Sequence, residues 1–175
     1  RNLIALDDYR SIFPTVKLAQ DSKSAGRWNT NVGGEYYACG IGSALAGRGA
    51  DLLLVDDPHS EQDVINGNFS VFEKAYEWFT FGARTRLMPG GRVAIIQTRW
   101  HLDDLTGRVV RDMGKNERAD QYEVVEFPAI LEVVSKKTKK VTQKPLWPEF
   151  FDLEALLRTK ASMPVFQWNS QYQQQ

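Results

Sequence analysis

The chain has 175 residues, enough for one domain with its own hydrophobic core. Its 22 lysine and arginine residues balance 22 aspartate and glutamate residues, which excludes a global positive field for recruiting nucleic acid, so any DNA contact must be local. One cysteine, Cys39, excludes an internal disulfide, and no apolar run approaches the ~20 residues that cross a bilayer, so we expect a soluble intracellular protein without membrane contacts.

The first third of the chain predicts a helix, a short strand, a hairpin and a loop. Apolar residues at helical spacing indicate a helix that begins near Leu3 and ends before Pro14. Residues 16–19 can form a short strand. Residues 26–31 and 35–41 are expected to pair as a hairpin, because the glycines at 33 and 34 supply the positive φ angles of a tight turn. A glycine-rich loop, residues 40–49, follows.

Residues 51–55 and the two acids after them carry the most information about chemistry. The four aliphatic residues 52–55 fit a strand buried on both faces of a parallel sheet. Ligands of open α/β sheets collect at the carboxyl ends of the strands, where Asp56 and Asp57 emerge. Adjacent carboxylates repel each other unless a cation compensates, which favours a bound Mg²⁺.

The spacing matches a Walker B element, in which the first acid (Asp56) holds the metal and the second (Asp57) polarises the attacking water. The alternative is that Asp-Asp-Pro simply turns the chain after a core strand.

The rest of the chain alternates helices with strands. This order predicts an α/β fold with a mainly parallel sheet flanked by helices. We expect a helix at 70–87 closed by Pro89-Gly90-Gly91, strands at 92–97 and 122–127, a short helix at 103–111, an exposed hairpin at 131–141, and helices at 153–160 and 164–172. The lysines of residues 136–140 fit a solvated hairpin tip, and a contact with DNA phosphates is the alternative.

Three more residues are candidates for a nucleotide site. Gln97 and Thr98 lie at the tip of the strand beside the two acids. An amide or hydroxyl there can detect the γ-phosphate and pass its loss on to the rest of the molecule. The alternative is that Thr98 only caps a turn. Arg48, flanked by glycines, suits an arginine finger that enters a neighbouring subunit's site. A solvated loop arginine or a phosphate-backbone contact is the alternative.

The loop at residues 42–49 has the glycine spacing of a Walker A phosphate loop but does not qualify as one. Arg48 stands where lysine belongs, and Gly49 stands where serine or threonine binds Mg²⁺. The loop also leads into a strand, whereas a phosphate loop must open a helix. No better match exists in the sequence.

Several short motifs, taken together and in order, resemble the large terminase subunit of tailed bacteriophages. They are Gly47-Arg48-Gly49 with Asp56-Asp57-Pro58, Arg84-Thr85-Arg86-Leu87 with Pro89-Gly90-Gly91, Thr98-Arg99-Trp100-His101 with Asp103-Asp104, Leu146-Trp147-Pro148, and Gln171-Tyr172-Gln173-Gln174. The similarity covers the chain from Trp28 to its end.

The resemblance implies a P-loop NTPase-like fold of the additional-strand, catalytic-glutamate class. It implies that residues 1–175 form one partial ATPase domain of a DNA-packaging motor, with residues 161–175 starting the linker to a nuclease domain. By position, Asp56 would bind Mg²⁺ and Asp57 would be the catalytic carboxylate. Thr98 would be the coupling residue with Gln97 beside the ATP, and Arg48 would be the finger.

The implied partners are ATP, double-stranded DNA, a portal protein, a small terminase subunit and further copies of the chain in a ring. The implied location is the host cytoplasm, with transient docking on the viral procapsid. Because the sequence holds no Walker A segment, we expect this chain alone to be inactive toward ATP. We also expect one face of the strand at 52–55 to lack cover.

Two alternatives of other classes stay open. Paired carboxylates can hold two cations, so a two-metal nuclease could use the acids Asp51, Asp56, Asp57, Asp103 and Asp104. A non-catalytic assembly module could dock on a portal or small packaging subunit through Trp147 and Trp168, although such tryptophans are more often core anchors.

Overall fold

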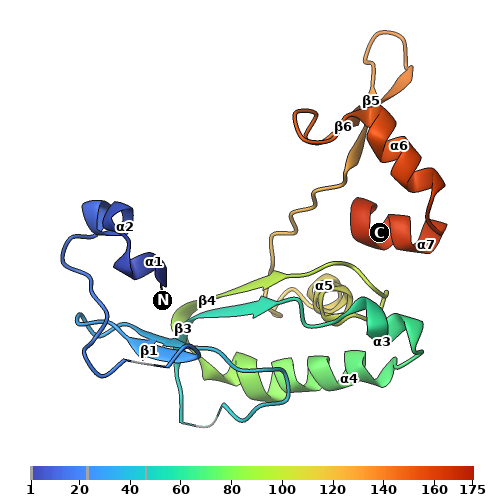
Figure 1. The fold of residues 1–175 in the computed structure, drawn as a ribbon. Coiled ribbons are helices and arrows are strands. Elements are labelled where there is room, and N and C mark those ends of the chain that lie inside the picture. Colours follow the sequence, from blue (N-terminus) through green and yellow to red (C-terminus); the bar gives the residue numbers. More distant parts are fainter. Residues whose placement is uncertain (1, 23, 46) are drawn as a thin grey trace. The chain divides into compact units, whose positions relative to one another are not determined.

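The structure, a computed structural model, describes residues 2–22, 24–45 and 47–175 and shows a mixed α/β fold. The strands in these residues form three two-stranded sheets, β1–β2, β3–β4 and β5–β6 (Figure 1). The chain divides into two compact units, Arg1–Ser43 and Ala44–Gln175. No helix in the described residues is long and apolar enough to span a membrane.

The first unit contains the predicted hairpin. β1 (Arg27–Asn29) and β2 (Glu35–Tyr37) are antiparallel, and the chain between them turns through Gly33 at a φ of 87°. Trp28 stacks on Tyr36 across the pair, with ring centroids 4.9 Å apart. The strand prediction for residues 16–19 is wrong, because that segment makes only an isolated bridge, Leu18 to Thr30.

The amino-terminal helix is interrupted. Two short helices, α1 (Asn2–Ala5) and α2 (Asp7–Ile12), replace the single predicted helix. Leu6 between them has extended backbone angles, φ −72° and ψ 146°, which no helical residue adopts. Helical spacing of apolar residues therefore located the helices but did not reveal the break.

The second unit is organised around a parallel strand pair, as predicted. β3 (Ala50–Asp56) lies beside β4 (Leu87–Ile96), with Leu53 opposite Val93 and Val55 opposite Ile95. Parallel neighbours need a long crossover between them. Here α3 (Glu61–Ile65), α4 (Ser70–Glu77) and the turns that follow supply it.

Only one face of β3 is covered. Val55 is buried and Leu53 is half-buried, whereas Leu52 and Leu54 are 63% and 55% exposed. The prediction of a strand buried on both faces is therefore wrong, and the expectation of one face without cover is confirmed. The alternation is that of a half-buried strand, because successive side chains point to opposite faces.

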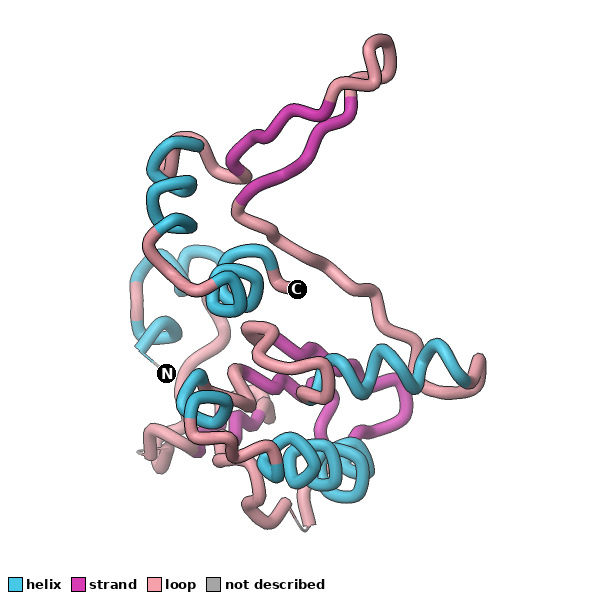
Figure 2. The backbone as a smooth tube through the Cα atoms, turned by 90° about the vertical axis from the view of Figure 1, so that its right-hand side faces the viewer, coloured by secondary structure: helices cyan, strands magenta, loops and turns pink. Residues whose placement is uncertain are grey.

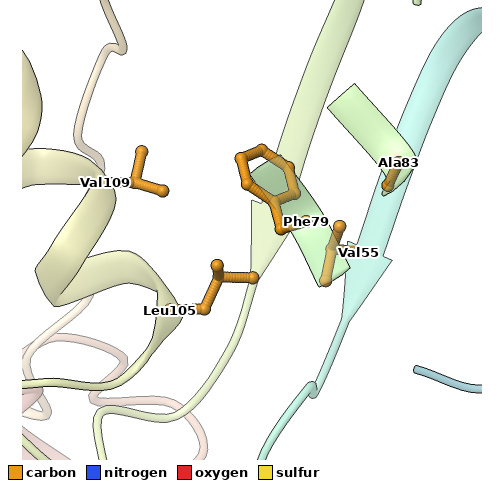
Figure 3. Close-up of a cluster of buried hydrophobic side chains, with 5 residues drawn as sticks. All are labelled: Val55, Phe79, Ala83, Leu105 and Val109. Atoms are coloured by element: carbon orange, nitrogen blue, oxygen red, sulfur yellow. The ribbon is translucent and has the colours of Figure 1, made fainter. Parts of the chain in front are cut away.

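The main core lies between this pair and two helical segments. Leu105 and Val109 of α5 (Leu105–Lys115) face Phe79 and Val55 in Figure 3, and Ala83 completes the cluster. The predicted helix at 103–111 is thus present but starts two residues later, at Leu105, after the capping residue Asp104.

The predicted helix at 70–87 is α-helical only as far as Glu77. It continues as a π-helix, η1 (Trp78–Ala83), and a 3-10 turn, η2 (Arg84–Arg86). The hydroxyl of Thr80 bonds the carbonyl oxygens of Tyr76 and Glu77, at the point where the α-helical hydrogen bonding ends. Side-chain bonds of this kind compete with the regular helix ladder.

Pro89-Gly90-Gly91 does not close that helix, contrary to the prediction, but lies inside β4. Ala50 pairs with Leu87 while Leu52 pairs with Arg92, so β4 bulges between these two pairs. Gly90 has a φ of 81° there. Proline and glycine suit a bulge, where a ladder hydrogen bond is missing and the backbone bends.

The predicted strand at 122–127 is not a strand. This segment runs as an extended loop between α5 and β5 in Figure 2. The backbone N–H of Tyr122 bonds Met113 Sδ and that of Phe127 bonds Gln174 Oε1, so these donors are taken by side chains. A cavity of about 720 Å³, lined by residues 91–97 and 120–127, lies between the segment and β4.

The carboxyl-terminal part follows the sequence prediction. β5 (Ile130–Val134) and β6 (Val141–Pro145) form the hairpin with the lysines at its tip, and α6 (Leu153–Ala161), α7 (Val165–Trp168) and a π-helical turn, η3 (Asn169–Gln173), follow. Ile130, Leu156 and Trp168 form a second buried cluster. Trp168 is thus a core anchor as expected, whereas Trp147 is 62% exposed, against that expectation.

Candidate functional site

Four predicted site residues lie together at the carboxyl ends of β3 and β4. Asp56 is opposite Ile96 in the parallel register, and the backbone N–H of Asp57 donates to the carbonyl oxygen of Ile96 at 2.9 Å. Gln97 and Thr98 directly follow Ile96. The two acids at the end of β3 and the amide and hydroxyl after β4 therefore share one edge of the sheet, where α/β proteins bind ligands.

Asp57 has an unusual backbone. Its side chain is exposed, and its φ of 41° lies in the left-handed region. Aspartate tolerates this region better than most residues, but the following residue, Pro58, disfavours helical angles at position 57. Backbone strain of this kind persists only where the surrounding structure enforces it, and it clusters at functional sites.

Gln97 and Thr98 are half-buried. Both polar atoms of the Gln97 amide are shielded from solvent and have no hydrogen-bond partner among the described residues. Gln97 is one of the residues around the cavity beside β4, as is Thr106, whose hydroxyl is likewise buried without a partner among the described residues. Such groups carry a desolvation cost that a polar ligand or water relieves.

Arg48 is not brought to these residues. It is half-buried and lies two residues before β3, in the glycine-rich loop whose Ala46 is outside the described residues. β3 spans Ala50–Asp56, which at ~3.3 Å per residue separates its two ends by about 20 Å. Arg48 therefore cannot reach Asp57 of the same chain.

The buried carboxylate of Asp104, which the sequence offered only as a possible nuclease metal ligand, has a structural role next to the end of β4. Asp104 is 0% exposed and caps α5 by accepting a hydrogen bond from the Gly107 N–H at 2.8 Å. The same carboxylate accepts from Arg99 Nε at 2.9 Å and from the Trp100 N–H at 3.2 Å. It thus fixes the segment that follows β4 to the start of α5.

The capping rule could have marked this aspartate as an N-cap, but nothing in the spacing shows the Arg99 contact.

His59, which sequence reasoning missed, ties the turn after β3 to the same helix. It is 5% exposed, and its Nε2 accepts a hydrogen bond from the Leu105 N–H at 3.0 Å. The ring stands edge-on to Phe72, with centroids 4.7 Å apart. Burial lowers the pKa of His59 below 6.5, against an opposing effect of the nearby Asp104 and Asp63 carboxylates. The two bonded residues are 46 positions apart, so no local signal predicts the contact.

The arrangement does not support a two-metal nuclease site. Asp51 lies near the amino end of β3 and Asp56 at its carboxyl end. Asp103 pairs with Arg111 at 2.6 Å, which lowers the pKa of the Asp103 carboxyl, and Asp104 is buried. The five acids therefore do not converge, whereas Asp56 and Asp57 remain open oxygen ligands for a hard cation such as Mg²⁺.

A search with protein-family models finds no match to this chain, and a search of curated proteins finds none. Functional assignment therefore depends on the geometry described above and on the motifs in the sequence.

Proposed function

We propose that this chain is the ATPase part of a terminase large subunit, which couples ATP hydrolysis to the movement of double-stranded DNA into a viral procapsid. The observation that carries the proposal is the parallel β3–β4 pair, with Asp56 and Asp57 at the end of one strand and Gln97 and Thr98 after its neighbour. This arrangement fits a P-loop NTPase-like fold of the additional-strand class, in which the acidic strand lies beside the sensing strand.

Each residue has a distinct role in this proposal. Asp56 is exposed and offers a carboxylate to Mg²⁺, which neutralises the charge on the β- and γ-phosphates of ATP when both are bound. Asp57 orients and polarises the attacking water. Thr98 and the unpartnered amide of Gln97 respond to the γ-phosphate and pass its loss to the segment after β4.

The position of Arg48 supports action between subunits. Because about 20 Å of β3 separates Arg48 from Asp57 within one chain, a finger role requires the site of a second copy. The proposal therefore includes a homo-oligomeric ring that docks on a portal protein and a small terminase subunit in the host cytoplasm. The exposed lysines of the β5–β6 tip offer a local contact to DNA phosphates in a chain with no net charge.

A second candidate, an assembly module without catalysis, is favoured by one observation. Trp147 is exposed and stacks on the exposed Phe150, with centroids 5.1 Å apart, and Phe150 contacts Phe151. Exposed aromatic clusters mark protein interfaces. A docking-only function predicts that Trp147→Ala abolishes portal binding while Asp57→Asn changes nothing measurable.

The ATPase proposal is tested by separating the two acids in the full-length product of the gene. Asp57→Asn should leave Mg·ATP binding nearly intact while kcat falls by about 10²–10⁴, as for a lost general base. Asp56→Ala should instead weaken Mg·ATP binding itself. Titration calorimetry and steady-state ATPase assays measure the two effects, and equal loss of binding in both variants would contradict the division of roles.

The role of Arg48 is tested by mixing subunits. Arg48→Ala and Asp57→Asn subunits should each be inactive alone, but mixed rings should recover part of the ATPase activity. Recovery is expected because some interfaces then pair an intact Arg48 with an intact Asp57. A mixture that assembles, as shown by sedimentation, yet stays inactive would assign Arg48 to the solvated-loop alternative.

A further inference from the structure

The turn after β3 is held at both of its ends. On its amino side, the Asp57 N–H bonds the Ile96 carbonyl oxygen at 2.9 Å and so extends the β3–β4 pairing by one residue. On its carboxyl side, His59 Nε2 accepts the Leu105 N–H at 3.0 Å. Asp57, with its φ of 41°, and Pro58 lie between these two bonds. A left-handed residue before proline keeps its conformation only if both ends of the turn are fixed.

Leu105, whose N–H group bonds His59, is itself held in place. Leu105 is the first residue of α5, is completely buried, and packs in the same cluster as Val55 of β3. The residue before it, Asp104, is bonded to Arg99 and to the backbone of Trp100. A bond to the Leu105 N–H therefore connects the turn to the core and to the segment after β4 together.

The chemistry at this position requires a side-chain acceptor. The first N–H groups of a helix have no partner inside the helix, and Asp104 satisfies that of Gly107 but not that of Leu105. An apolar residue at position 59 would leave the Leu105 donor buried without a partner. His59 supplies the acceptor only with Nε2 unprotonated, which places the ring proton on Nδ1. His59 Nδ1 is buried and has no hydrogen-bond partner in the described residues.

We propose that His59 is the positioning residue for Asp57: its bond to the Leu105 N–H holds the turn so that Asp57 keeps the left-handed backbone that presents its carboxylate at the sheet edge. The inference depends on the proposed function only for the role given to Asp57. It assigns to His59 no contact with substrate.

Two substitutions at position 59 distinguish the effect of losing the hydrogen bond from the effect of losing the volume of the ring. His59→Gln keeps an acceptor close to the place of Nε2, whereas His59→Leu fills a similar space without one. His101→Gln is the matched control, because His101 also contacts the Phe72 ring, with stacked centroids 5.1 Å apart, and its Nδ1 accepts the Asp103 N–H. Amide exchange of Leu105, followed by NMR on this chain, should accelerate at least tenfold in His59→Leu and change little in the other two variants.

The decisive measurement couples position 59 to position 57. Asp57→Gly should raise Tm by about 2–4 °C in the unsubstituted chain, because the steric strain that aspartate bears at a positive φ, and glycine does not, exceeds the extra backbone entropy that glycine loses on folding. The same change should give no rise in His59→Leu, where the turn has relaxed, and should keep its effect in His59→Gln. A purely structural role of His59 would leave the Asp57→Gly effect unchanged, so equal Tm shifts in all backgrounds would overturn the proposal.

Two further outcomes keep the test clear. If His59→Leu does not fold, the ¹⁵N shifts of the His59 ring in the unsubstituted chain decide: an unprotonated Nε2 supports the proposal, and a protonated Nε2 overturns it. None of these readouts requires nucleotide. A failure of the ATPase proposal, seen as full activity of Asp57→Asn in the full-length protein, is therefore distinguishable from a failure of the His59 proposal.

Discussion

Asp57 and His59 lie in one short turn, but one is exposed and the other is buried. The Asp57 carboxylate is open to solvent while its backbone is constrained, and the His59 ring is buried while its acceptor nitrogen is used. Neither feature is favourable locally: a left-handed non-glycine residue and a buried imidazole each cost free energy. Their combination in a turn beside a parallel strand pair is what we expect of a site maintained for chemistry.

The buried imidazole also predicts how stability depends on pH. Burial lowers the pKa of His59 in the folded state, so the unfolded chain binds the proton first as the pH falls through 6.5. The stabilising contribution is therefore fully present above pH 6.5 and is lost as the pH falls below it toward the lower folded-state pKa. The neighbouring carboxylates Asp104 and Asp63 reduce this effect but do not reverse it.

Thermal unfolding of the chain between pH 7.5 and 5 should show this loss. His59→Gln, which cannot titrate, should lose less Tm over the interval. Identical slopes for the unsubstituted chain and His59→Gln would show that His59 is not the group responsible.

At the scale of an element, α5 contains two glycines in opposite situations. A Cβ on Gly107 would overlap the backbone carbonyl of Leu102 and the guanidinium of Arg99, whereas a Cβ on Gly114 meets nothing within 4 Å. Gly107→Ala should therefore destabilise the protein by about 1–3 kcal/mol through overpacking, despite the higher helix propensity of alanine. Gly114→Ala should stabilise it by about 1 kcal/mol.

Urea denaturation of the two variants measures both effects in the same helix. Since the substitutions are chemically identical, a difference in sign can only come from the surroundings of each position. Stabilisation by both would mean that the start of α5 is not packed against Leu102 as described.

The elements that sequence reasoning located well are those with strong local signals. The strand ending at Asp56, its parallel neighbour, and the helices at 103–111 and 153–160 all follow from apolar periodicity and polar ends. The break at Leu6, the π-helix at Trp78–Ala83 and the extended loop at 122–127 have no such signal. The π-helix follows hydroxyl bonds from Thr80 to the backbone, and two N–H groups of the loop at 122–127 bond distant side chains, which are properties of the folded chain.

The same distinction holds within the site. Asp56, Asp57, Gln97 and Thr98 could be selected because each lies at or directly after the end of a strand, and strand ends can be found from the sequence. His59 could not be selected, because its partner Leu105 is 46 positions away and meets it only after α5 packs on the sheet. The structural bond between Asp104 and Arg99, five positions apart, has no sequence signal of its own. Long-range side-chain contacts carry no periodic signature.

For the whole molecule, the uncovered face of the β3–β4 pair is an exposed apolar surface. Leu52 and Leu54 on β3 and Ile96 on β4 are each more than half exposed. Parallel sheets are almost always covered on both faces, because helices of the crossover connections pack on each side. Cover from another segment or from a second copy of the chain would complete such a sheet.

The face also makes a prediction about association. At micromolar concentration the chain should self-associate in sedimentation velocity experiments, because an exposed apolar patch favours contact with a second such surface. The double variant Leu52→Gln/Leu54→Gln should sediment as a monomer with nearly unchanged stability, since both side chains already face solvent. Leu53→Ala, on the covered face, should cost about 2–3 kcal/mol through the cavity that it leaves, and it should not change association. Monomeric behaviour of the unsubstituted chain, or equal association of all three proteins, would show that this face does not drive contact between copies.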